Sequence, residues 1–228
     1  LGGQWNIASA MPDKAGFATL TSHLIKSLKK YNIAVQLNSN ITKDEVLKNK
    51  PDAVVLATGA IPLGLNIPGG MGANVVQAND VITGAAQTDR RVVVIGGRFI
   101  GMEVAIMLAE QGKEVTLVNR SGLGGKKGPE ESNTYRALAR RLIELRIPLF
   151  LNTVLVEITK TSVIANWGQE VFALPADTVI LAIGVEPVNQ LAAELEGEGT
   201  RVFSIGDCKM PRHAASATFD AAKIASKI

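Results

Sequence analysis

A glycine-rich turn is the segment of this sequence whose residue types and spacing best suit it to bind a cofactor. It lies between an apolar run that ends at Ile95 and a helical pattern that begins at Phe99. Its residues are, in order, Gly96, Gly97, Arg98, Phe99, Ile100 and Gly101. This order is close to the Gly-x-Gly-x-x-Gly turn of dinucleotide-binding folds, where free N–H groups and the dipole of the following helix attract a pyrophosphate. The sequence therefore predicts a dinucleotide site here.

Arg98 stands where that motif has its second glycine, whose missing side chain lets the backbone approach the pyrophosphate. The Cβ of Arg98 should obstruct this approach, although its guanidinium could pair with phosphate oxygens in a different pose. Two interpretations are therefore open at this position: a working dinucleotide site, or a degenerate turn with a purely structural role.

Asn119, Arg120 and Ser121 follow the next apolar run, where an NAD-binding fold has an acidic residue for the ribose 2′-hydroxyl. No acid stands at these three positions, and their side chains instead offer donors that suit a 2′-phosphate. We therefore expect NADP rather than NAD if a nucleotide binds. The alternative is an ordinary polar strand exit.

Short apolar runs alternate along the chain with helical patterns, which is typical of a parallel sheet covered on both faces. The expected strands are residues 34–37, 53–56, 92–95, 115–118, 179–181 and 202–205, and the expected helices are residues 16–30, 99–110, 133–145 and 214–227. From Val154 to Phe172 the pattern alternates and is broken at Lys160 and Gly168, which predicts a small antiparallel meander.

An internal repeat indicates two copies of one nucleotide-binding design. Residues 51–62 read PDAVVLATGAIP and residues 176–187 read ADTVILAIGVEP, with Asp, Val, Leu, Ala, Gly and Pro matching in place. A shorter echo pairs the LGGQ of residues 1–4 with the LGGK of residues 123–126. In the second copy the LGGK element follows the glycine turn. The same spacing between turn and LGGQ in the first copy puts the glycine turn of that copy before residue 1. We therefore expect that copy to be truncated, without its opening strand, phosphate loop and helix.

Composition excludes several classes of protein. Apolar residues make up 46% of the 228 residues and charged residues 20%, which is ordinary for a globular chain. A net charge of +3 and only 4% aromatic residues argue against nucleic-acid or membrane binding. The single cysteine, Cys208, excludes an intrachain disulfide and a C-x-x-C redox pair, and fits a reducing, cytoplasmic setting.

Taken in order, these motifs resemble the flavin-dependent pyridine nucleotide oxidoreductases that have two dinucleotide domains. The order is a GGQ loop, ATG after an apolar strand, GG-x-FIG-M-E-x-A, AIG-x-x-P and IGDC. The details LGGQWNIASA and GDC-x-x-PR, without a C-x-x-C, are most similar to the carboxy-terminal portion of one type. These are the NADH:flavin oxidoreductases of the 2,4-dienoyl-CoA reductase and trimethylamine dehydrogenase type.

The resemblance implies cofactor-binding residues on both sides of the site. On the flavin side they are Gly2, Gly3, Gln4, Ala57, Thr58, Gly59, Gly206, Asp207 and Ala214. On the nicotinamide side they are Glu103, Ala182 and Gly184, in addition to the glycine turn and residues 119–121. For Asp207 a second interpretation is open, because an aspartate before a helix is a common N-cap.

We therefore predict an α/β fold with two Rossmann-like dinucleotide-binding domains and a small antiparallel meander. Residues 87–187 would form an NAD(P)-type domain inserted into a truncated FAD-type domain made of residues 1–86 and 188–228. The resemblance implies hydride transfer from NAD(P)H to FAD in a parent flavoenzyme, with no catalytic side chain or metal required.

Two expectations about the isolated chain accompany this prediction. It should bind FAD weakly or not at all, because the missing phosphate loop would have supplied the helix-terminus N–H groups for the pyrophosphate, and it should be inactive alone. Its expected partner is the remainder of the parent enzyme. In the dienoyl-CoA reductases that remainder is a barrel with FMN and an iron–sulfur cluster. The alternative function is a degenerate nucleotide-binding or scaffold domain with no redox activity of its own.

Overall fold

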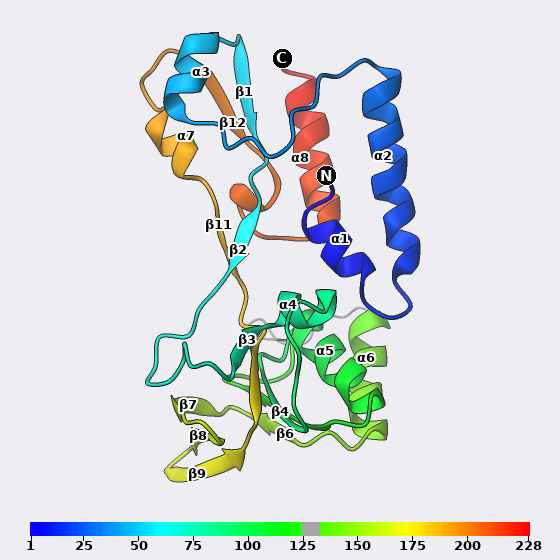
Figure 1. The fold of residues 1–228 in the computed structure, drawn as a ribbon, viewed down its shortest axis with the longest axis vertical. Coiled ribbons are helices and arrows are strands. Elements are labelled where there is room, and N and C mark those ends of the chain that lie inside the picture. Colours follow the sequence, from blue (N-terminus) through cyan, green and yellow to red (C-terminus); the bar gives the residue numbers. More distant parts are fainter. Residues whose placement is uncertain (125–132) are drawn as a thin grey trace. The chain divides into compact units, whose positions relative to one another are not determined.

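The computed structural model describes residues 1–124 and 133–228, which form two compact units (Figure 1). The split unit comprises residues 1–6, 16–61 and 185–228. The inserted unit comprises residues 7–15 and 62–184. Each unit is built on parallel strands, so the predicted α/β class with an antiparallel meander is confirmed.

A five-stranded parallel sheet forms the centre of the inserted unit, in the order β3-β10-β4-β5-β6. The strands are β3 (Val75–Gln77), β4 (Arg91–Ile95), β5 (Glu114–Asn119), β6 (Leu149–Leu151) and β10 (Thr178–Leu181). Every residue of β10 is buried, as are four of the five in β4. Both faces of the sheet are covered, which explains why these strands are uninterrupted apolar runs.

Helices cover one face of this sheet and an antiparallel sheet covers the other (Figure 1). The helices are α4 (Ala78–Thr83), α5 (Phe99–Glu110) and α6 (Asn133–Glu144), and the meander strands are β7 (Val154–Ile158), β8 (Ser162–Trp167) and β9 (Glu170–Pro175). Val94 packs towards Met102 and Leu108 of α5, whereas Val93 packs towards Val163 and the meander. Most of α5 is buried, so its sequence is apolar around the whole helix.

The split unit holds a two-stranded parallel sheet and most of the remaining helices. Its strands are β1 (Ala53–Leu56) and β12 (Arg201–Ser204), and its helices are α2 (Ala18–Lys30), α3 (Lys43–Asn49), α7 (Gln190–Glu194), α8 (Ala214–Ala225) and the 3₁₀ turn η2 (Gly206–Cys208). Strands β2 (Ala60–Pro62) and β11 (Val185–Pro187) pair with each other, and α1 (Gln4–Ser9) and the 3₁₀ turn η1 (Ala15–Phe17) complete the elements.

The predicted strand at residues 34–37 is wrong. The segment has no regular structure, and Val35 and Leu37 are 46% and 59% exposed. An apolar run becomes a strand only where another strand hydrogen-bonds to it. In the described part of the split unit, the parallel sheet consists of β1 and β12 alone.

Helix α3 was not predicted, although its start carries a recognisable signal. Thr42 and Glu45 form a capping box, in which each side chain binds the backbone N–H of the other residue.

Residues 62–86, assigned from the sequence to the FAD-type domain, pack in the inserted unit. The reason is that β3 hydrogen-bonds to β10 there.

The described residues contain neither a helix that could span a membrane nor a cluster of metal-ligating side chains. None of the helices there is both long and apolar enough to cross a membrane. The same residues contain no cluster of three or more side chains able to ligate a metal ion.

An ion pair joins the starts of two neighbouring strands of the inserted unit. The Arg91 backbone N–H donates to Asp177 Oδ2 at 3.0 Å, and Arg91 Nε lies 3.1 Å from Oδ1. Hydrogen bonds from this arginine lower the pKa of Asp177 from 3.8 to about 2. At the equivalent position of the sequence repeat, Arg201 Nε instead donates to the backbone carbonyl of Asp52, at 3.3 Å.

We predict that Asp177→Asn lowers the free energy of unfolding at neutral pH and that this difference disappears near pH 2. Because the folded-state pKa lies below 3.8, the charged carboxylate stabilises the folded protein above that pH and stops doing so as the pH falls through about 2. Urea midpoints of both proteins between pH 7 and pH 2 measure this. Asp52→Asn, which removes the matching carboxylate of the repeat, is the control. A difference that stays constant over the whole pH range would contradict the prediction.

Candidate functional site

Three predicted nucleotide-binding motifs of the inserted unit follow neighbouring parallel strands. They are residues 96–101 after β4, residues 119–121 at the end of β5 and residues 182–184 after β10. The Ala182 N–H donates to the Ile95 carbonyl at 2.8 Å, and the Gly96 N–H donates to the Val118 carbonyl at 2.9 Å. The three motifs therefore meet at one carboxyl edge of the sheet, where open α/β sheets bind ligands.

Two glycines of the turn are required by contacts within the protein. A Cβ on Gly96, whose φ is +118°, would lie 2.3 Å from the Ala182 carbonyl oxygen. A Cβ on Gly101 would lie 1.9 Å from the Gly96 carbonyl oxygen. Distances below 3.0 Å are not tolerated, so the turn closes tightly against residue 182 and the start of α5. The N–H groups at this helix end remain directed towards the carboxyl edge.

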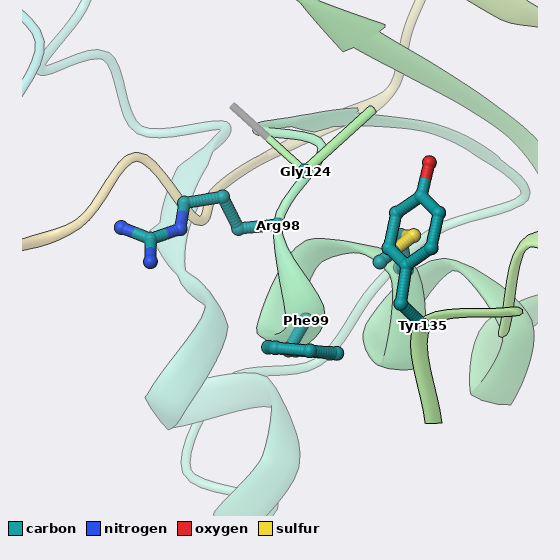
Figure 2. A pocket seen from close by; sticks show the side chains of 5 residues that line it. Arg98, Phe99, Gly124 and Tyr135 are labelled. Carbon is teal, nitrogen blue, oxygen red and sulfur yellow. The ribbon is translucent and has the colours of Figure 1, made fainter. Parts of the chain in front are cut away.

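Arg98 is the N-cap residue of α5 and is exposed to solvent. Its φ of −91° and ψ of −177° are open to any residue, so only its side chain distinguishes it from a glycine here. It borders a shallow pocket together with Phe99, Met102, Gly124 and Tyr135 (Figure 2). Figure 2 shows the arginine side chain extending away from the Tyr135 ring.

The side-chain amide of Asn119 is used within its own loop. Its Nδ2 donates to the Gly122 carbonyl at 2.8 Å and to the Ser121 carbonyl at 3.1 Å. Arg120, which lies between Asn119 and Ser121 in the sequence, is exposed and forms no ion pair with another residue that the structure describes. Of the three donors predicted for a 2′-phosphate, Arg120 is therefore the one that extends into solvent.

Glu103 of α5 is bound by a lysine that the sequence analysis did not single out. Lys14 Nζ lies 2.5 Å from Glu103 Oε1, and the glutamate side chain is only 11% exposed. A largely buried carboxylate needs such a partner. The two residues are 89 positions apart, so no local pattern could have indicated the contact.

Two of the predicted flavin-side motifs also meet at a sheet edge, in the split unit. Residues 57–59 follow β1 and residues 206–207 follow β12, its parallel neighbour. The Ile205 N–H donates to the Leu56 carbonyl at 3.0 Å, which holds the two turns together. The Thr58 hydroxyl donates to the Val188 carbonyl. As in the inserted unit, motifs that follow neighbouring parallel strands therefore lie together at one carboxyl edge.

Asp207 does not cap the final helix, because the N-cap residue of α8 is His213. Asp207 Oδ1 instead accepts a hydrogen bond from the Arg212 backbone N–H at 3.1 Å. The other predicted flavin-side residues lie at element starts: Ala214 is the first residue of α8 and Gln4 is the first residue of α1. The carbonyls of Gly2 and Gly3 accept hydrogen bonds from residues 5 and 6, within the same turn.

A buried acid on α8 ties this turn together. The Asp220 side chain is 7% exposed and pairs with Arg212, and its Oδ1 lies 3.5 Å from Lys209 Nζ. Its Oδ2 accepts the Gly206 N–H at 3.3 Å. Burial raises the pKa of Asp220, but the hydrogen bonds from Arg212 and Gly206 outweigh it and the pKa is lowered. The sequence signal of this contact is a lone acid among the small residues of α8.

Part of the LGGK echo, residues 125 and 126, lies outside the described residues. Gly124, its last described residue, donates its N–H to the Gly97 carbonyl at 2.9 Å. This bond attaches the loop after β5 to the glycine turn.

Comparisons with known proteins agree with this arrangement. The chain is 36% identical over 214 residues to an NADH oxidase of Thermoanaerobacter brockii, a match that covers 91% of this chain and 32% of that protein. It is 34% identical over 209 residues to a bilirubin reductase of Mediterraneibacter gnavus, again covering 91% of this chain and 32% of the relative. The chain thus spans about a third of the length of these relatives.

Among solved structures, a 2-naphthoyl-CoA reductase in complex with 2-naphthoyl-CoA superposes with a TM-score of 0.88. The sequences are 28% identical, and the match covers 100% of this chain and 34% of that one. A sequence profile of the pyridine nucleotide-disulphide oxidoreductases matches residues 6–221. The fold, the repeated sheet-edge motifs and this match confirm the resemblance seen in the sequence, and the chain belongs to the pyridine nucleotide-disulphide oxidoreductase family.

Proposed function

We propose that the inserted unit binds NAD(P)H and the split unit binds FAD, so that this chain passes hydride between them within a larger reductase. The observation that carries the proposal is the meeting of residues 96–101, 119–121 and 182–184 at one carboxyl edge. The contacts among these residues form a tight glycine turn at the amino terminus of the twelve-residue helix α5. Such a helix end offers N–H groups and a positive dipole to a pyrophosphate.

Individual residues have distinct roles in this proposal. The backbone of residues 96–101 would hold the pyrophosphate, and the Arg120 guanidinium would bind the 2′-phosphate of NADP. Ala182, Gly184 and Glu103 would line the nicotinamide side. Lys14 neutralises the Glu103 carboxylate and fixes its position. When bound, NAD(P)H supplies the hydride and FAD accepts it, so the chain's own residues act by orienting the two cofactors.

The flavin site is proposed for the other sheet edge, in the split unit. Residues 57–59 and the Gly206–Asp207 turn end two neighbouring parallel strands. Gly206 has a φ of +63°, and Asp207 is partly exposed beside it. Residues 2–4 and Ala214 would add contacts at the starts of α1 and α8. The proposed role of Asp207 is to hold the ribityl or phosphate region of FAD.

We further propose that the partner of this chain is the remainder of a longer flavoenzyme of the reducing cytoplasm. Relatives about three times as long support a larger protein. By resemblance, its remainder would be a barrel with FMN and an iron–sulfur cluster. The test is anaerobic addition of NADPH to the full-length flavoenzyme, which should bleach its flavin absorption band. An unchanged band would overturn the hydride-transfer proposal.

A second candidate function, a scaffold domain with a degenerate nucleotide site, rests on Arg98. This residue places a side chain at the helix end where the motif has a glycine. A chain that binds neither NADPH nor NADH, but is required for the full-length protein to fold, would favour the scaffold.

We predict that the chain binds NADPH more tightly than NADH. A guanidinium–phosphate hydrogen bond contributes about 1.5 to 3 kcal/mol, so the ratio of dissociation constants should be roughly tenfold to hundredfold. Arg120→Ala should remove most of this preference by weakening NADPH binding alone. Calorimetric titration with both nucleotides measures it. Equal affinities, or tighter NADH binding, in the wild type would contradict the assignment.

We predict that Arg98→Gly strengthens NADPH binding, because it removes a side chain from the pyrophosphate path and leaves the helix dipole intact. Arg98→Ala separates the two interpretations, since it deletes the guanidinium and keeps the Cβ. If the Cβ obstructs, the gain with alanine should be smaller than with glycine. If the guanidinium instead hydrogen-bonds to the phosphates, both variants should bind NADPH about 1 to 3 kcal/mol more weakly than the wild type. That result would refute obstruction.

A further inference from the structure

The loop that follows β5 is organised around the side chain of Asn119. The amide nitrogen donates to two carbonyl oxygens of the loop, Ser121 at 3.1 Å and Gly122 at 2.8 Å, and it lies 3.4 Å from Ser121 Oγ. Because both carbonyls can only accept, the side chain at position 119 must be a donor. This side chain therefore binds two consecutive carbonyls of the loop that carries Arg120.

The same side chain packs against the glycine turn. A Cβ on Gly97 would lie 3.0 Å from both Cγ and Nδ2 of Asn119, so the amide lies directly against the Gly97 backbone. The Gly124 N–H donates to the Gly97 carbonyl at 2.9 Å, which fastens the far end of the loop to the same residue. Asn119 thus couples the loop that carries Arg120 to the proposed pyrophosphate turn.

The backbone around Asn119 is held from the opposite side as well. The Thr153 N–H donates to the Asn119 carbonyl at 3.1 Å, and the Asn152 N–H donates to the Ser121 carbonyl at 3.3 Å. The Ser121 carbonyl therefore receives two donors, one from the β6–β7 turn and one from the amide. An aspartate at 119 would place carboxylate oxygens against the Ser121 and Gly122 carbonyls, where oxygen faces oxygen without a proton between them.

We propose that Asn119 is a positioning residue for nucleotide selection: it donates to the loop carbonyls, not to the nucleotide, and so presents the Arg120 guanidinium at the sheet edge. The proposal rests on the proposed NADPH site. It differs from the sequence-based interpretation, in which Asn119 itself donates to the 2′-phosphate. It also means that an acid at position 119 opens the loop and does not create an NADH site.

A double-mutant cycle with Asn119→Asp and Arg120→Ala tests the proposal on the full 228-residue chain. Dissociation constants for NADPH and NADH are measured by calorimetry for the wild type, both single variants and the double variant. We expect each single variant to bind NADPH about tenfold more weakly and NADH within about twofold of the wild type. If Asn119 acts through Arg120, the double variant should also lose about tenfold, not a hundredfold.

Two further variants separate positioning from loss of folding. Asn119→Ser keeps a donor and should recover part of the NADPH affinity that Asn119→Asp loses. Asn74→Asp is the matched control, because Asn74 Nδ2 likewise donates to a turn carbonyl of the inserted unit, that of Thr159 at 2.9 Å. We expect this control to lower the melting temperature without changing the ratio of NADPH to NADH affinity.

The outcomes distinguish this proposal from the function on which it rests. A wild type that binds neither nucleotide would overturn the proposed function. Tighter NADH binding by Asn119→Asp would show that the side chain contacts the ribose and would overturn positioning. Additive losses in the cycle would do the same, because they would mean that Asn119 and Arg120 act independently.

Discussion

The site depends on the backbone hydrogen bonds that join β4 to β10 on one side and to β5 on the other. The bonds Ala182–Ile95 and Gly96–Val118 fix the point at which each strand stops, and so bring three distant loops to one edge. The tight closure of the turn follows, because Gly96 and Gly101 have backbone atoms where a Cβ would lie. The helix end is directed to that edge only because the turn closes in this way. A shift in the register of these strands would therefore separate the three loops, even with every side chain of the site unchanged.

Both sheet edges lie at the ends of parallel neighbouring strands, but different side chains satisfy their polar groups. In the inserted unit the neutral amide of Asn119 serves the carbonyls of an exposed loop. In the split unit the buried carboxylate of Asp220 serves the Gly206 N–H and the Arg212 guanidinium. Free carbonyls need a donor and free N–H groups need an acceptor, so each unit carries the side chain that its turn requires. The two units therefore share parallel strand pairing, while the residues that hold each turn differ.

The sequence predicted those parts of the structure that depend on neighbouring residues. The bounds of α5 match the prediction of residues 99–110, because the glycine turn before the helix and its largely apolar sequence are local features. Residues 34–37 failed because a strand depends on a partner that no local pattern reveals. The Lys14–Glu103 pair was missed for the same reason, since 89 residues separate its members. At position 119 the residue type was recognised, but its hydrogen-bond partners depend on a loop path that only the structure supplies.

The glycine pattern alone says less about nucleotide binding than its resemblance to a motif implies. Gly96 and Gly101 are required by contacts with residues of the same chain, so a unit that binds no nucleotide would need them equally. Position 98 is different, because its backbone is extended and its side chain is exposed. Glycine at the second place of the motif serves only the approach of a ligand. The residues that would decide nucleotide binding at this edge are therefore Arg98 and Arg120, whose side chains are exposed, and not the glycines that the packing requires.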